Sequence, residues 1–272
     1  MQTCGRPRSV ALEDRAARVW TWGTPGDPPM LLLHSLAAHS HWWDWVAPRL
    51  AQHHDVVALD ARGHGGSDRA DSYHFDDYVA DVVQALDALD VTAATVVGHS
   101  MGGYVGALLA ARHPERVGAL VIADILTGWT PTLDDFAGKQ ARREPPRFAS
   151  REEAGAGFRL GPPQTTAPAE RIRHLGEMGV VERTPGAWHY AFDPRVFLHP
   201  PPDPWPFLGR VRCPTLVVRG ERSPVMDREA CAAVAKAVAR GQAAEIANSF
   251  HHLIVDDPDG FVALLDDWDA TR

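Results

Sequence analysis

Short apolar runs alternate with segments of helical periodicity along most of this chain of 272 residues. Four of the runs are almost free of polar residues and end near His34, Asp60, Gly98 and Asp124. Continuous apolar runs of this kind are typical of parallel strands, because helices cover such strands on both faces. The alternation therefore predicts an α/β fold built on a parallel sheet.

The helices of this fold are expected between the apolar runs. Apolar residues at helical spacing from Phe75 to Leu89 predict one helix that packs on the sheet. A second helix is expected from His41 to His54, although Pro48 lies near its middle. Later in the chain we expect the strand CPTLVVRG, a helix from Asp227 to Arg240, the strand AAEIAN and a closing helix that begins near Pro258.

The alternation stops between residues 127 and 206. This segment is rich in Pro, Gly and Arg and is too long for a simple loop. We expect it to form an inserted, mostly helical cap. The core would then consist of residues 1–126 and 207–272.

The segment Thr95–Gly103, TVVGHSMGG, places Ser100 between two glycines where a predicted strand meets a predicted helix. This is the nucleophile-elbow spacing, G-x-S-x-G. The serine must occupy a sharp, strained turn, and side chains at the two glycine positions would collide with the adjoining helix and strand. The turn directs the helix N-terminus at the same point as the hydroxyl. The motif predicts that Ser100 is a nucleophile.

Other motifs accompany the elbow: LLLHS followed by a Trp-containing segment, DARGHGGSD, CPTLVVRGE and HHLIVDDP. Together with GHSMGG they resemble the α/β-hydrolase fold superfamily, in its cap-bearing serine-hydrolase form, over nearly the whole chain. The resemblance implies a mostly parallel eight-stranded sheet flanked by helices, with the helical cap inserted after the strand that follows the nucleophile helix. It also implies the chain order nucleophile, acid, histidine.

A serine hydroxyl needs a base within hydrogen-bond reach, and the base needs a group that orients it. The chain order places the base after the last strand, where His251 and His252 are neighbours. The family pattern H-x-x-x-x-x-x-P, which Pro258 completes, favours His251. His252 is then expected beside the pocket.

The position of the acid departs from the commonest family pattern. That pattern has an Asp shortly after the penultimate strand, where this chain has Ser223. Some members carry the acid at the end of the strand that follows the nucleophile helix, which is Asp124 here. A carboxylate at the end of so apolar a strand requires a partner, and a histidine N–H would supply one. We therefore expect Asp124 to be the acid, with Asp227 and Glu221 as alternatives.

Two backbone N–H groups should bind the negative oxygen of the transition state. By family analogy they belong to Met101, directly after the nucleophile, and to Leu36, in a loop where Ser35 replaces the usual glycine. Candidate pocket residues are aromatic side chains of the cap and the second histidine of the HH pair: Trp129, Trp188, Tyr190 and His252. The alternative is that the cap aromatics form a small core of their own.

The predicted reaction is hydrolysis of a carboxylic ester or lactone of a small, largely apolar or aromatic substrate through an acyl-enzyme. Alternatives are hydrolysis of the C–C bond of a β-diketone-like substrate, a thioesterase, and a non-hydrolytic lyase or cyclase on the same fold. Haloalkane dehalogenases and epoxide hydrolases of this superfamily use an Asp nucleophile, so the serine at position 100 argues against both.

Composition excludes several other classes. A net charge of −8 gives no electrostatic reason to bind nucleic acid or anionic lipid. No run approaches the ~18 apolar residues of a membrane helix, and no apolar secretion signal precedes the core. Neither HExxH nor CxxC occurs, and three distant cysteines make no disulfide framework. We expect a cytoplasmic monomer or homodimer with a small-molecule substrate and with no cofactor, metal, nucleic-acid partner or membrane partner.

Overall fold

A computed structural model describes residues 5–271. Within this range a central sheet has the strand order β1-β2-β4-β3-β5-β6-β9-β10. Its strands are β1 (Arg6–Ala11), β2 (Ala16–Trp22), β3 (Pro29–Leu33), β4 (Asp55–Leu59), β5 (Ala94–His99), β6 (Val117–Ala123), β9 (Thr215–Gly220) and β10 (Gly241–Ile246). Only β2 runs antiparallel to its neighbours, so the expectation of a mostly parallel eight-stranded sheet is confirmed.

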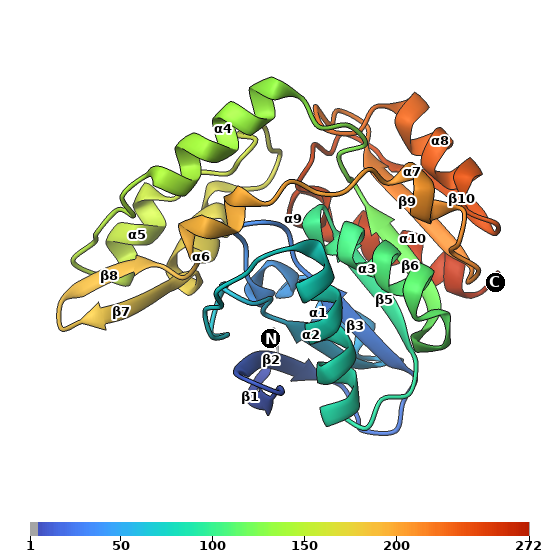
Figure 1. Cartoon of the computed structure of the whole chain (residues 1–272), viewed down its shortest axis with the longest axis horizontal. Helices are drawn as coiled ribbons and strands as arrows, with labels where there is room; N and C mark the ends of the chain where they lie inside the picture. The colour runs from blue at the N-terminus through green and yellow to red at the C-terminus, as the bar shows by residue number, and fades with distance from the viewer. Residues whose placement is uncertain (1–4, 272) are drawn as a thin grey trace.

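Helices cover both faces of this sheet (Figure 1). One face carries α2 (Phe75–Ala88), α3 (Met101–Arg112) and α8 (Arg228–Ala237), and the other carries α1 (Ala47–Leu50) and α10 (Pro258–Asp269). Successive residues of a strand point to opposite faces of the sheet. Val96 packs in the core beneath α2, α3 and α8, and Val97 packs in the core beneath α1 and α10. Both are fully buried. This explains why the central strands are apolar at nearly every position.

The helix expected from His41 to His54 is wrong as a single element. The structure has a 3₁₀ turn, η1 (Ser40–Trp43), and then the one-turn helix α1. Pro48 lies in the first turn of α1, where a helix needs no N–H from that residue. The proline therefore allows a new helix to start instead of interrupting a long one.

The segment between β6 and β9 contains helices and one hairpin. Its elements are α4 (Pro131–Arg142), α5 (Arg151–Gly157), α6 (Ala169–Met178), β7 (Val180–Thr184), β8 (Ala187–Tyr190), η3 (Pro194–Leu198) and α7 (Trp205–Leu208). The antiparallel β7–β8 pair was not expected from the sequence. In Figure 1, α4, α5, α6 and the hairpin project together from one end of the sheet. The limits of the cap, residues 127–206, stay a prediction.

Hydrogen bonds join this segment to the core at several places. After β3, Nε2 of His39 donates to the carbonyl of Leu175 at 3.0 Å, and His174 bonds to Asp44 at 2.8 Å. After β4, the backbone N–H of Gly65 donates to the carbonyl of Ala191 at 2.6 Å, and the backbone N–H of Asp193 donates to the carbonyl of Gly63 at 2.8 Å. After β10, the Asp256 carboxylate accepts from the backbone N–H of Thr166 at 3.0 Å. The segment is thus held against residues that follow β3, β4 and β10. None of the described helices is long and apolar enough to cross a bilayer.

Candidate active site

Ser100 lies at the turn from β5 into α3, with φ 52° and ψ −115°. This is a left-handed, strained conformation for a residue with a side chain. The flanking glycines permit it. A Cβ on Gly98 would stand 2.2 Å from the carbonyl oxygen of Gly102, and a Cβ on Gly102 would stand 2.2 Å from that of Leu33 in β3. The strand, turn and helix therefore pack at a distance that only glycine allows, as the motif predicts.

The structure brings His251 and Asp124 together from loops far apart in the sequence. His251 follows β10, Asp124 follows β6, and the Nδ1–H of the imidazole donates to Oδ1 of the carboxylate at 2.8 Å. Both side chains are buried, and Asp124 is fully so. Since the carboxylate can only accept, this bond leaves Nε2 of His251 as the basic nitrogen.

The two alternative acids have other partners. Asp227 is the N-cap of α8, where its side chain accepts from the backbone N–H of Ala230 at 2.7 Å. Glu221 accepts from the backbone N–H of Asn248 at 2.7 Å. Neither side chain is bonded to the imidazole of His251, so of the three carboxylates the geometry favours Asp124.

Within residues 5–271, no protein group accepts the hydroxyl proton of Ser100 or bonds to Nε2 of His251. In ligand-free enzymes the bond between nucleophile and base is often long, and it tightens when substrate binds. The pairing of Ser100 with His251 therefore stays a prediction.

The backbone N–H groups of Leu36 and Met101 stand at the same edge of the sheet, after β3 and at the start of α3. In the described part of the chain neither donates to another protein group. Unpaired donors beside a helix N-terminus suit an anionic oxygen. Their role as an oxyanion hole stays a prediction.

Two buried histidines fix the loop that carries Leu36. Nε2 of His34 accepts from the backbone N–H of Ala61 at 3.0 Å, and Nε2 of His64 accepts from that of Ala37 at 3.1 Å. Burial lowers the pKa of His34 to about 4 and the pKa of His64 to about 3, so both rings are neutral and can accept. The positive φ of this loop, 56°, belongs to Ala37 and not to Ser35. The serine that replaces the family's glycine therefore introduces no backbone strain.

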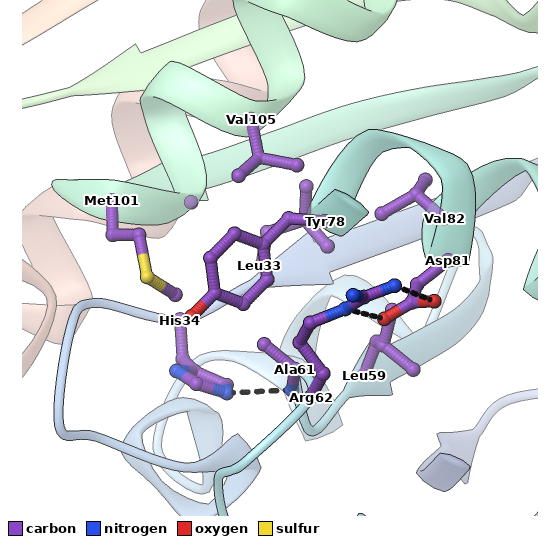
Figure 2. Close-up of a pocket in the computed structure, with 11 residues that line it drawn as sticks. Leu33, His34, Leu59, Ala61, Arg62, Tyr78, Asp81, Val82, Met101 and Val105 are labelled. Atoms are coloured by element: carbon purple, nitrogen blue, oxygen red, sulfur yellow. Dashed lines mark hydrogen bonds and ion pairs between the residues drawn. The ribbon is translucent and has the colours of Figure 1, made fainter. Parts of the chain in front are cut away.

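A cavity of about 20 Å³ lies behind this loop (Figure 2). It is lined by Leu33, His34, Leu59, Ala61, Arg62, Tyr78, Asp81, Val82, Met101, Gly102 and Val105. The volume holds one water and is too small for an organic substrate. Figure 2 shows the guanidinium of Arg62 against the carboxylate of Asp81, an ion pair with an Nε–Oδ2 distance of 2.7 Å. This ion pair fixes Arg62 within the loop after β4.

His99, His251 and His252 form a buried group in which one ring nitrogen of each lies within 4.8 Å of the others. Nε2 of His99 donates to the carbonyl of His251 at 2.8 Å, and Nε2 of His252 donates to that of Pro162 at 2.9 Å. Burial lowers the pKa of His252 to about 3 and that of His99 well below its usual value. Three imidazoles are a donor set for Zn²⁺. A metal bound through Nε2 of His251 would, however, remove the base, so the two roles exclude each other.

The cap aromatics contact each other and other parts of the cap. Tyr190 packs on Phe148 and Phe158, and its hydroxyl donates to the carbonyl of Ala154 at 3.1 Å. Trp188 lies under the guanidinium of Arg151.

The remaining two candidates for the pocket wall occupy different environments. Trp129 donates to Asp134 near the surface, whereas His252 is 1% exposed and packs against Trp42. None of the four candidates is hydrogen-bonded to the side chain of Ser100, and their role in binding stays a prediction.

Ser223 has a role in this site that no sequence motif assigns. Ser223 stands in the turn after β9, and its hydroxyl donates to Oδ1 of Asp124 at 2.7 Å. The signal in the sequence was the serine itself, in the place where the family commonly has its acid.

Comparison with known proteins agrees with this fold. A family model described as alpha/beta hydrolase fold matches residues 28–258. A serine hydrolase-like protein of Danio rerio is 39% identical over 46% of this chain and 41% of its own length. Epoxide hydrolase 4 of Mus musculus is 35% identical over 37% of this chain and 29% of its own. The matched segment thus spans about two fifths or less of these relatives. The crystal structure of E-2-(acetamidomethylene)succinate hydrolase superposes with a TM-score of 0.87 at 22% identity and covers 98% of this chain and 99% of that one.

Proposed function

The chain belongs to the α/β hydrolase fold family, and we propose that it is a serine hydrolase. Its relatives include an epoxide hydrolase and a fluoroacetate dehalogenase. The proposed substrate is a carboxylic ester or lactone that is small and largely apolar or aromatic. The observation that carries the proposal is the hydrogen bond from His251 to Asp124, beside the strained turn of Ser100.

In the proposed mechanism the hydroxyl oxygen of Ser100 attacks the substrate carbonyl while Nε2 of His251 takes the proton. Asp124 holds the ring through Nδ1–H and stabilises the imidazolium that forms. The backbone N–H groups of Leu36 and Met101 bind the oxygen that becomes negative. His251 then protonates the leaving alcohol. A water attacks the acyl-enzyme carbonyl while His251 takes its proton, and His251 returns that proton to Ser100 as the acid product leaves.

The identity of the nucleophile supports attack at a carbonyl. A relative such as the mouse epoxide hydrolase shares part of the sequence, but an Asp nucleophile is the pattern for epoxide opening in this superfamily, and position 100 is serine. Cleavage of a C–C bond, thioester hydrolysis, and lyase or cyclase chemistry are the alternative uses of the same groups. The apolar or aromatic substrate is proposed from the aromatic content of residues 127–206 alone.

A fluorophosphonate probe and short p-nitrophenyl esters test the proposal. The wild-type protein should be labelled at Ser100 and should turn over the esters, and Ser100→Ala should lose both. Ser249→Ala is the matched control, because it deletes a buried hydroxyl whose one bond within residues 5–271 is to the carbonyl of Ala247 at 3.4 Å. Labelling without turnover of any ester would favour the lyase or cyclase alternative. Equal labelling of Ser100→Ala and wild type would refute the nucleophile.

A further inference from the structure

Three donors converge on the carboxylate of Asp124. Oδ1 accepts from the hydroxyl of Ser223 at 2.7 Å and from Nδ1–H of His251 at 2.8 Å. Oδ2 accepts from the backbone N–H of Gly220 at 2.9 Å. A carboxylate that is fully buried needs such donors, because each one offsets part of its lost hydration. Oδ1 of Asp124 thus accepts hydrogen bonds from both His251 and Ser223.

The hydroxyl of Ser223 has a fixed direction. Its oxygen accepts from the backbone N–H of Val225 at 3.1 Å and from that of Met226 at 3.3 Å. A hydroxyl has two lone pairs and one proton. Since the backbone takes both lone pairs, the proton is directed to Asp124. Rotation of the carboxylate about its Cβ–Cγ bond would break this bond and the bond to Gly220 together.

Ser223 also lies in the turn where the family commonly has its acid. Gly220-Glu221-Arg222-Ser223 leaves β9 into the turn in which most family members carry the triad acid. Here the turn supplies a neutral donor to an acid that stands at the end of the neighbouring strand, β6. The two positions are therefore adjacent in space, within one hydrogen bond of each other.

We propose that Ser223 is a positioning residue, whose hydroxyl holds the carboxylate of Asp124 in the orientation that receives Nδ1–H of His251. The proposal rests on the proposed function, in which Asp124 orients the base. The same geometry assigns position 223 as a second place from which a carboxylate can reach His251.

The first test measures ester turnover by variants at position 223. Ser223→Ala should lower kcat about 10- to 100-fold, the loss expected for one hydrogen bond to a charged group, and should leave KM unchanged. Ser223→Thr keeps the hydroxyl and should recover most of this loss. Ser249→Ala should retain wild-type kcat. A Ser223→Ala protein with wild-type kcat would overturn the proposal, as would a loss that Ser223→Thr shares in full.

The second test moves the acid. Asp124→Asn should be nearly inactive, and Asp124→Asn/Ser223→Asp should exceed it at least tenfold, because the new carboxylate extends one bond further towards the imidazole. Failure of the double variant to exceed Asp124→Asn would refute the second place for the acid.

A spectroscopic readout separates this proposal from the proposed function. In protein with ¹⁵N-labelled histidine, the Nδ1 proton of His251 should resonate far downfield in the wild type, and its signal should shift or disappear in Ser223→Ala. This measurement needs neither substrate nor a working nucleophile. If Ser100→Ala keeps full activity while the proton signal responds to Ser223→Ala, the proposed function fails and the positioning role stands. An unchanged signal in Ser223→Ala refutes the positioning role.

Discussion

A Cβ on Gly102 would stand 2.2 Å from the carbonyl oxygen of Leu33, because α3 begins directly against β3. Gly102→Ala should therefore separate the helix from the strand and cost about 1–3 kcal/mol of stability, as overpacked cores do. It should also displace Met101 and lower ester turnover. Gly128→Ala is the control, because no atom lies within 4 Å of its added Cβ. Urea denaturation of the two variants compares the costs, and equal midpoints would contradict this account.

Exchange of a single carboxylate for an amide distinguishes the candidate acids. Asp124→Asn should reduce kcat by about 10³–10⁴, because the amide no longer stabilises the imidazolium and favours the wrong tautomer. Asp227→Asn should leave kcat close to wild type, since Asn is as good an N-cap as Asp for α8. Steady-state kinetics on one p-nitrophenyl ester decides between them. A severe loss in Asp227→Asn alone would transfer the role of acid to that residue.

Asp81 carries much of the stability of the loop after β4. Its carboxylate is paired with Arg62 at 2.7 Å and also with Arg15, and the Arg62 and Asp81 side chains are 6% and 5% exposed. Asp81→Leu removes the buried partner of both guanidinium groups and leaves the buried Arg62 with the more distant carboxylate of Asp77, at 3.5 Å, so it should cost about 3–5 kcal/mol. Asp135→Leu removes the exposed partner of Lys139 and should change the free energy of unfolding little. Chemical denaturation measures both, and similar costs for the two variants would be inconsistent with this role.

Acid should destabilise the protein through its buried histidines. Burial lowers the pKa of His34 to about 4 and the pKa values of His39, His64 and His252 to about 3. In the unfolded chain a histidine titrates near 6.5. Below that pH the unfolded state binds protons that the native state refuses, so stability is complete above about pH 6.5 and falls as the pH drops towards the native pKa values.

Each such histidine contributes up to about 1.4 kcal/mol per pH unit within this window. Between about pH 6.5 and 4, His64→Gln should therefore reduce the slope of the free energy of unfolding against pH by the contribution of one histidine, which is at most about 1.4 kcal/mol per pH unit. A slope that is the same in wild type and His64→Gln would contradict the assignment of a neutral native ring.

Elements with a local physical signal were predictable from the sequence. The buried parallel strands follow from continuous apolar runs, and the turn at Ser100 follows from glycines that the packing requires. The hairpin β7–β8 gave no such signal, because four of the five residues of β7 are exposed and no alternation marks the inner face. The edge strand β1 is similar, with a single buried residue, Val10.

The candidate site could be predicted only in part for the same reason. The position of Asp124 at the end of an apolar strand indicated a partner, and the structure shows His251 there. The contact with Ser223 depends on how the turn after β9 lies against the end of β6, and no single motif encodes that distance. Contacts between cap and core are likewise set by tertiary packing, so the sequence could suggest pocket residues such as Trp188 and Tyr190 without placing them.

The proposed cap is joined to the segment that supplies the proposed base. Asp256 accepts from Thr165, Thr166 and Phe250, and Arg171 and His252 add bonds between residues 162–171 and residues 250–256. Grafting a cap from another hydrolase would sever the bonds between residues 162–171 and residues 250–256 and would loosen the segment that holds the imidazole against its carboxylate. A chimera designed to change substrate preference should therefore transplant both stretches as one piece, or it will alter the speed of the chemistry along with the choice of molecule.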